Sequence, residues 1–252
     1  MTNCERKSWR RWGGITSRSN ENTTAPPAGG PASHILTAPP IMIRLIRIPI
    51  LLSLAALAVF AQQPAGDPDA LFREGVQMFF DGRPKESVAA FDKLIALEPD
   101  VKPQLWQRGL SLYLAGDYKG GREQFEVHQT VNGHDVENAA WHFICVTRAE
   151  NLDAARKALI PIEGDTRVPM KEVHELFTGK GSVEQVLKAA ETGDGDDLRN
   201  HRCYAHLYLG LYFEALGDEA RAREHMLKAA RDYRMDHYMG RCAQVHVKVR
   251  GW

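Results

Sequence analysis

The sequence predicts an all-α fold, arranged as an α-solenoid of helix-turn-helix hairpins that ends in a C-terminal capping helix. The segment that starts at Leu71 matches the segment that starts at Leu105, so corresponding positions lie 34 residues apart. A repeat of this length is typical of proteins in which each unit is a pair of helices. Both segments have apolar residues at helical spacing, and we expect Gly82 and Gly116 to end their first helices.

Glycine and phenylalanine also recur at corresponding positions of the two segments. Gly75 corresponds to Gly109, and Phe91 corresponds to Phe125. A glycine in the first helix lets the second helix approach closely, because it has no side chain at the contact. We expect the large apolar residues to fill the space between neighbouring hairpins.

These positions resemble the signature of tetratricopeptide repeats, whose glycine, aromatic and proline positions recur every 34 residues. The first repeat, near 69–100, supplies Leu71, Gly75, Met78, Gly82, Ser87, Phe91 and Pro99. The second repeat, near 102–134, has glycine in place of the proline and supplies Leu105, Gly109, Leu112, Gly116, Gly121 and Phe125. The resemblance implies a right-handed solenoid.

Later parts of the chain follow the signature unevenly. The third repeat, near 136–164, is divergent because Phe143 replaces the glycine. Residues 168–191 are predicted to form a hairpin without the signature, and we expect a helix over 236–249 to cover the exposed apolar edge of the solenoid. The signature returns near 203–235, with Gly210, Gly217 and Ala222 in place.

Residues 208–230 are also similar to the carboxy-terminal part of bacterial NlpI-type envelope tetratricopeptide proteins. That resemblance implies a dimeric adaptor for envelope proteases and wall-cutting enzymes. The cysteine that carries the lipid anchor in that family is missing here, since Gln62 follows the expected cleavage point.

The N-terminal part of the chain differs in composition from the rest. Residues 1–41 are polar and lack apolar periodicity, which predicts a disordered leader or a misannotated start ahead of Met42. Residues 42–61 have two arginines, an apolar run and small residues at the end, which is typical of a signal peptide. A signal anchor is the alternative. We therefore expect an exported periplasmic or extracellular protein, with a short linker at 62–68 and the repeat domain at 69–252.

The charge of the mature part bears on its partners. Residues 62–252 contain 25 Lys and Arg and 30 Asp and Glu. Nucleic-acid and anionic-membrane surfaces need clustered cations, so this mild acidity argues against both kinds of partner. We expect protein or peptide partners, no stable membrane anchor and no cofactor.

The first helices of tetratricopeptide hairpins line a concave groove, and the resemblance places apolar and aromatic side chains there. They are Phe72, Val76, Phe79, Trp106, Leu110, Tyr113 and Ile144. The family's carboxylate clamp needs Lys and Asn at positions that hold Phe72 and Val76 in the first repeat, so the groove should take an amphipathic helix or an extended apolar peptide. Alternatively, a neighbouring hairpin, residues 62–68 or a homodimer mate buries these side chains.

Residues with the potential for chemistry do not form a complete site. Three Cys/His pairs lie at helical spacing, but a structural zinc needs four ligands, so no metal site is expected. A disulfide between Cys203 and Cys242 is left open. Residues 178–182 (TGKGS) are predicted to be a turn and residues 193–197 (GDGDD) a solvated loop.

No catalytic residue is assigned. The sequence therefore predicts a non-enzymatic protein-protein interaction scaffold or adaptor. The alternative is a structural homodimeric module whose groove is buried at the dimer interface.

Overall fold

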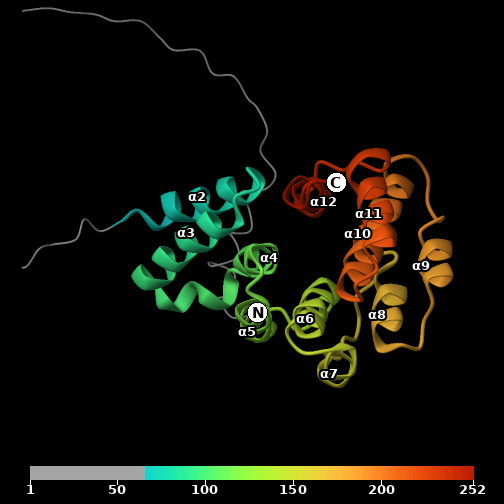
Figure 1. The fold of residues 1–252 in the computed structure, drawn as a ribbon, viewed down its shortest axis with the longest axis horizontal. Helices are drawn as coiled ribbons and strands as arrows, with labels where there is room; N and C mark the ends of the chain where they lie inside the picture. The colour runs from blue at the N-terminus through green and yellow to red at the C-terminus, as the bar shows by residue number, and fades with distance from the viewer. Residues whose placement is uncertain (1–65) are drawn as a thin grey trace, which may run out of the picture. The chain divides into compact units, whose positions relative to one another are not determined.

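All regular structure in residues 66–252, the part of the chain that the computed structural model describes, is helical (Figure 1). No residue of that range belongs to a strand, so the predicted all-α class is confirmed. The predicted leader, the signal peptide and most of the linker lie outside the described residues. Among the described helices, none is long and apolar enough to cross a bilayer.

Most of the helices follow one another in pairs joined by short turns. In chain order the elements are α2 (Pro68–Phe80), α3 (Pro84–Leu97), the 3₁₀ helix η2 (Pro99–Gln104), α4 (Trp106–Ala115), α5 (Tyr118–Gln129), α6 (Val136–Ala149), α7 (Leu152–Ala158), α8 (Met170–Thr178), α9 (Val183–Ala189), α10 (Gly195–Ala215), α11 (Glu219–Leu227), the π-helix η3 (Lys228–Asp232) and α12 (Tyr238–Arg250). Most helices pack against the next helix along the chain, and α6 contacts both α7 and α8.

Glycine sets the close contact within the first two hairpins. A Cβ atom on Gly75 would lie 2.7 Å from the ring of Phe91, and one on Gly109 would lie 2.5 Å from the ring of Phe125. Such distances are too short for any other residue, so each ring packs directly on the backbone of the facing helix. Gly116 ends α4 in the left-handed conformation, with φ of +85°.

Polar caps mark several helix starts. The side chain of Asp117 accepts a hydrogen bond from the backbone of Gly120 at the start of α5. Ser182 and Gln185 form a capping box at the start of α9, and Gly179 ends α8 in the left-handed conformation. Of the predicted turn at 178–182, Thr178 is the last residue of α8, and residues 179–182 connect α8 to α9.

The third hairpin departs from the first two where the glycine is replaced. The ring of Phe143 stacks on that of Phe177 in α8, with centroids 4.9 Å apart. Since α6 packs against α8 as well as α7, this ring fills a contact between hairpins. The short helix α7 has Ala155 as its one buried residue.

Helix α10 is longer than the sequence predicted. It begins at Gly195, ahead of the repeat expected near 203–235. The expectation of a loop over 193–197 is therefore wrong for residues 195–197, which form the first turn of α10 although they are exposed. Acidic residues at a helix N-terminus are favourable, which explains why this segment joins the helix.

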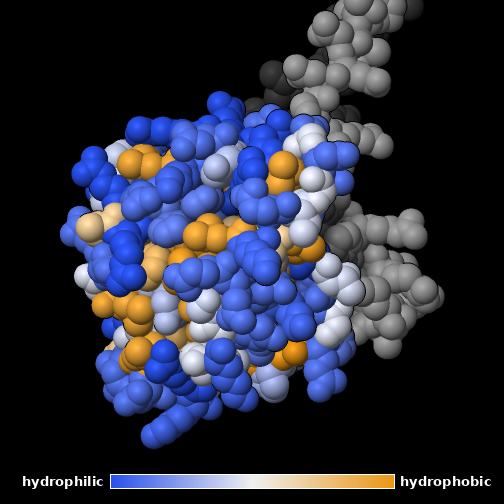
Figure 2. All heavy atoms as spheres, turned by 90° about the vertical axis from the view of Figure 1, so that its right-hand side faces the viewer, coloured by the Kyte–Doolittle hydropathy of each residue, from blue (hydrophilic) through white to orange (hydrophobic). Residues whose placement is uncertain are grey.

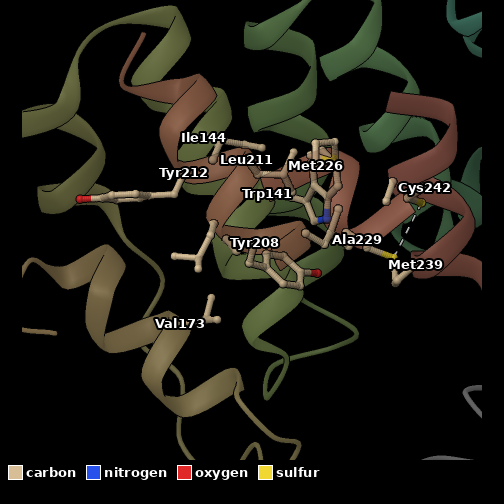
Figure 3. Close-up of a cluster of buried hydrophobic side chains, with 14 of the residues drawn as sticks. Trp141, Ile144, Val173, Tyr208, Leu211, Tyr212, Met226, Ala229, Met239 and Cys242 are labelled. Atoms are coloured by element: carbon tan, nitrogen blue, oxygen red, sulfur yellow. Dashed lines mark hydrogen bonds between the residues drawn. The ribbon is translucent and has the colours of Figure 1, made fainter. Parts of the chain in front are cut away.

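The last helix joins the two ends of the described chain. Helix α12 packs against α10, α11 and η3, and it also contacts α2 in the first hairpin (Figure 1). It therefore does more than cover the edge of the last hairpin. Its Met239 and Cys242 belong to the main core, which also includes Trp141 and Tyr208 (Figure 3).

Candidate functional site

The predicted groove residues lie on the first helices of three successive hairpins. Helix α2 carries Phe72, Val76 and Phe79, helix α4 carries Trp106, Leu110 and Tyr113, and helix α6 carries Ile144. The structure places Phe79, Leu110, Tyr113 and Ile144 in the main core, where they are fully buried. Val76 and Trp106 are partly buried against it.

Phe72 occupies a different place from the other groove residues. It belongs to a smaller core with Phe91, Leu94, Val101 and Leu105. Its ring meets the ring of Phe91 edge to face, with centroids 5.9 Å apart. Phe72 therefore packs against the second helix of its own hairpin, and Val76 packs against both this smaller core and the main core.

Tyr238, the first residue of α12, lies against the aromatic residues of the first two hairpins. Its ring centroid is 5.9 Å from that of Phe79, 4.8 Å from that of Phe80 and 4.7 Å from that of Trp106. We call the side chains that contact α12 the α12 seat, which comprises Phe79, Phe80, Trp106 and Tyr113. Three of the predicted groove residues, Phe79, Trp106 and Tyr113, thus contact a helix from the same chain.

The far end of α12 is held by a buried carboxylate. Glu214, near the end of α10, accepts hydrogen bonds from Nε and Nη2 of Arg250 at 2.9 and 2.6 Å. It also pairs with Nε2 of His246. Burial alone would raise the pKa of Glu214, but the neighbouring His246 and Arg250 lower that pKa to about 2. The carboxylate therefore stays ionised and ties α12 to α10.

Cations of α12 also lie against the first hairpins. The guanidinium of Arg241 lies 3.6 Å from the ring centroid of Phe80, and that of Arg250 lies 5.9 Å from the ring of Tyr113. Both distances fit a cation–π contact. The aliphatic part of Lys248 lies beside Gly82, where a Cβ would be 3.1 Å away.

Three polar atoms at this interface are buried without a hydrogen-bond partner. They are the hydroxyls of Tyr113 and Tyr238 and the amide nitrogen of Gln244. Burying a polar group without a partner costs about 1–3 kcal/mol. These three atoms therefore reduce the stability that the packing of α12 provides.

A second polar cluster lies where α6 begins. Arg167 pairs with Asp135 at 2.5 Å, with Glu137 at 2.9 Å and with Asp165 at 2.6 Å. Burial and the nearby Asp135 raise the pKa of Glu137 to about 8, against the influence of Arg167. The cluster anchors the loop before α8 to the N-terminus of α6, since three carboxylates share one guanidinium.

The histidines and cysteines are mostly core groups. Nδ1 of His206 lies 2.8 Å from Nδ1 of His225, and both rings are buried between α10 and α11. Cys145, Cys203 and Cys242 are free and buried, and burial raises the pKa of each thiol. Within residues 66–252, no group of three or more His, Cys, Asp or Glu side chains is placed to hold a metal ion.

The sequence analysis did not predict that residues of α12 contact Phe79, Trp106 and Tyr113. A signal for them exists in the chain, because Tyr238, Cys242, His246 and Arg250 follow one another at intervals of four residues. This spacing places them along one side of a helix. Their counterpart Glu214 has no such signal, because its role depends on where α10 meets α12.

Few large hydrophobic side chains of the described chain are exposed. On the face shown in Figure 2, hydrophobic atoms form several small patches among hydrophilic atoms. The exposed large hydrophobic residues of the described chain are Leu97 and Leu216. Neither belongs to the α12 seat, so the main aromatic contact surface is the one that α12 covers. Comparison with known proteins finds no matching family model and no matching curated protein.

Proposed function

We propose that this chain is an exported, non-enzymatic protein-protein interaction scaffold or adaptor, built as a right-handed solenoid of tetratricopeptide-type hairpins. One observation carries the proposal: aromatic side chains on α2 and α4 bind a helix of the same chain, α12, by ring contacts of 4.7 to 5.9 Å with its Tyr238. Binding a helix in a groove is a common mode of peptide recognition, and it uses anchors of this kind.

Packing within the hairpins supports the repeat assignment. The rings of Phe91 and Phe125 rest on Gly75 and Gly109, which are the positions that the tetratricopeptide signature assigns to close helix contact. Gly210 has the same function in the later hairpin, since a Cβ there would lie 3.0 Å from Met226. Three hairpins with one packing rule favour a repeat protein over an unrelated helical bundle.

The partners are proposed to be proteins or peptides rather than nucleic acids. Residues 62–252 have five more acidic than basic residues, which disfavours a phosphate backbone as a ligand. The proposed export depends on the predicted signal peptide at 42–61. Fractionation of the native host followed by immunoblotting tests this part, and recovery of the chain solely from the cytoplasm would contradict it.

A homodimer in which a second copy covers the groove is the alternative. The contacts of α12 account for the burial of Phe79 and Tyr113 within one copy of the chain, which favours the adaptor proposal. Light scattering on the purified mature chain separates the two, because a monomer removes the dimer alternative.

The proposed function is tested by crosslinking in the native host. Tagged wild-type chain is compared with Trp106→Ala, which removes a partly buried anchor, and with Leu97→Ser, a matched change at an exposed apolar residue outside the seat. We expect mass spectrometry to find proteins enriched by wild type and Leu97→Ser and depleted at least fivefold by Trp106→Ala. Equal recovery with all three chains would contradict a groove-binding adaptor.

A further inference from the structure

Two imidazoles face each other across the contact between α10 and α11. Nδ1 of His206 lies 2.8 Å from Nδ1 of His225, and both side chains are buried. At this distance one nitrogen donates a proton and the other accepts it. A further proton on the accepting nitrogen would remove the acceptor and bring two N–H groups against each other. The hydrogen bond therefore exists only while the pair is neutral.

An aromatic ring covers one face of each imidazole. His206 stacks on Tyr233 with ring centroids 5.2 Å apart, and His225 stacks on Phe213 with centroids 5.4 Å apart. The four rings come from α10, α11 and the segment after η3. Burying a charge is unfavourable unless a counter-ion or hydrogen bonds compensate for the lost water. A charged imidazole between these rings is therefore less stable than one in water.

The charged groups near the pair are either cations or carboxylates that already bind a cation. Glu191 and Glu224 are the carboxylates that favour protonation of the pair. Glu224 pairs with Lys228 at 2.7 Å, and Glu191 pairs with Arg202 at 2.5 Å. Lys228 disfavours protonation of the pair, and so does Arg221. A positive charge on the pair would therefore add to cations that lie nearby.

Acid should separate the pair, because the closed contact lowers the proton affinity of its imidazoles. Burial, the neighbouring His225 and Lys228 lower the pKa of His206 from 6.5 to about 4, and burial lowers the pKa of His225. Once separated, both imidazoles titrate near their ordinary pKa. A separated pair therefore binds protons that the closed contact excludes, and the closed contact loses stability as the pH falls from 6.5 to 4.

Helix α11 buries few side chains. Three of its nine residues are buried, namely Ala222, His225 and Met226, whereas 12 of the 21 residues of α10 are buried. A Cβ on Gly210 of α10 would lie 3.0 Å from Met226, so that part of the contact is apolar. His225 is the polar member of the three. A change in its charge therefore acts on a large share of the surface that α11 buries.

We propose that the pair of His206 and His225 is an acid-sensitive switch, in which protonation of the pair releases α11 and η3 from α10 while the first two hairpins stay folded. The inference does not depend on the proposed adaptor function. It makes the exposure of the surface of α10 under α11 depend on pH.

Hydrogen exchange on the purified wild-type chain tests the switch. Protection factors, corrected for the intrinsic effect of pH on exchange, are compared at pH 7 and pH 5. We expect the protection of α11 to fall about tenfold more than that of α4 and α5. An equal loss in α11 and in α4 and α5 would mean global unfolding and would overturn the inference. Unchanged protection of α11 would overturn it as well.

A double variant separates the effect of the imidazoles from that of the rest of the contact. His206→Asn/His225→Asn places amides there, which can share a hydrogen bond but do not titrate in this range. The difference between α11 and the first two hairpins should then fall below about twofold. His201→Asn changes an exposed imidazole near the start of α10 and should behave as wild type. A double variant that keeps the wild-type difference contradicts the switch, and the wild-type measurement decides alone if this variant does not fold.

Discussion

The ring of Tyr238, at the start of the last helix, lies 4.7 Å from the indole of Trp106, at the start of the second hairpin. This contact connects the first part of the described chain to its last helix. Helix α12 therefore packs against the first hairpin as well as against the last one. Removing either ring should therefore lower the stability of the whole domain.

The hydroxyl groups of two buried tyrosines should be dispensable. Tyr113→Phe and Tyr238→Phe each remove a buried hydroxyl that has no partner, so we expect the free energy of unfolding to stay unchanged or to rise by about 1 kcal/mol. Tyr204→Phe is the control, because the Tyr204 hydroxyl has a hydrogen-bond partner, Nδ1 of His237 at 3.5 Å. That variant should lose about 1 kcal/mol in urea unfolding. A large loss from Tyr113→Phe would show that its hydroxyl has a partner after all.

The packing glycines should tolerate no side chain. Gly109→Ala places a methyl group 2.5 Å from the ring of Phe125, so we expect it to cost about 2 kcal/mol of unfolding free energy. Gly133→Ala is the matched control, since the nearest atom to its Cβ is 3.9 Å away, on Gln129. The control should change stability by less than about 0.5 kcal/mol. Equal effects of the two substitutions would contradict the close packing of α4 on α5.

The buried carboxylate of α10 should be essential for docking α12. Glu214→Gln leaves His246 and Arg250 without their anion, and we expect a loss of about 3 kcal/mol at pH 7. Glu224→Gln removes an ion pair of 2.7 Å with Lys228, but on the exposed face of the last hairpin. Its cost should be below about 0.5 kcal/mol. Thermal denaturation at fixed ionic strength compares the two, and a similar cost for both would refute the role given to Glu214.

The histidine pair between α10 and α11 predicts a loss of stability in mild acid. Burial and the neighbouring His225 lower the pKa of His206 from 6.5 to about 4. As the pH falls through 6.5, the unfolded chain binds a proton that the folded imidazole refuses until about pH 4. This stabilisation is complete above pH 6.5 and is lost between pH 6.5 and 4.

Substitution of one imidazole isolates its share of that acid sensitivity. His206→Gln should remove about 2 kcal/mol from the decrease in unfolding free energy between pH 7 and pH 4. His201→Gln, which changes an exposed imidazole near the start of the same helix, is the control. Urea unfolding at a series of pH values measures both. An unchanged pH profile for His206→Gln would contradict the assignment.

The cluster around Arg167 should stabilise the loop before α8. Arg167→Met leaves Asp135, Glu137 and Asp165 close together without their cation. Since Arg167 is partly exposed, we expect a moderate cost of about 1–2 kcal/mol, smaller at high salt. Arg199→Met, which breaks an exposed pair with Asp196, should cost little. Denaturation at low and high ionic strength checks both the size and the salt dependence.

The helices and the packing within the first two hairpins could be predicted from the sequence because their causes are local. The 34-residue spacing of Gly75 and Gly109, and of their partners Phe91 and Phe125, reflects contacts within a single hairpin. Helix ends at Gly116 and Gly179 follow from residues that occupy positive φ without strain. Apolar periodicity and glycine at helix ends can be recognised in a short segment, without knowledge of distant parts of the chain.

The start of α10 and the packing of Phe143 were harder to predict. Residues 195–197 have the composition of a loop, but their carboxylates suit the first turn of a helix. Phe143 interrupts the repeat signature, and only its position on Phe177 explains the change. For Phe143, the decisive partner lies outside the repeat, in α8.

By itself, the sequence determined that this chain forms helical hairpins and that aromatic side chains recur on their first helices. Only the tertiary structure decided what covers those side chains. Tyr238 and Trp106 are far apart along the chain, and Glu214 meets Arg250 because two helices cross there. Such contacts produce no periodic pattern in the sequence. They depend on the relative positions of successive hairpins in space, and the pattern within one hairpin does not determine those positions.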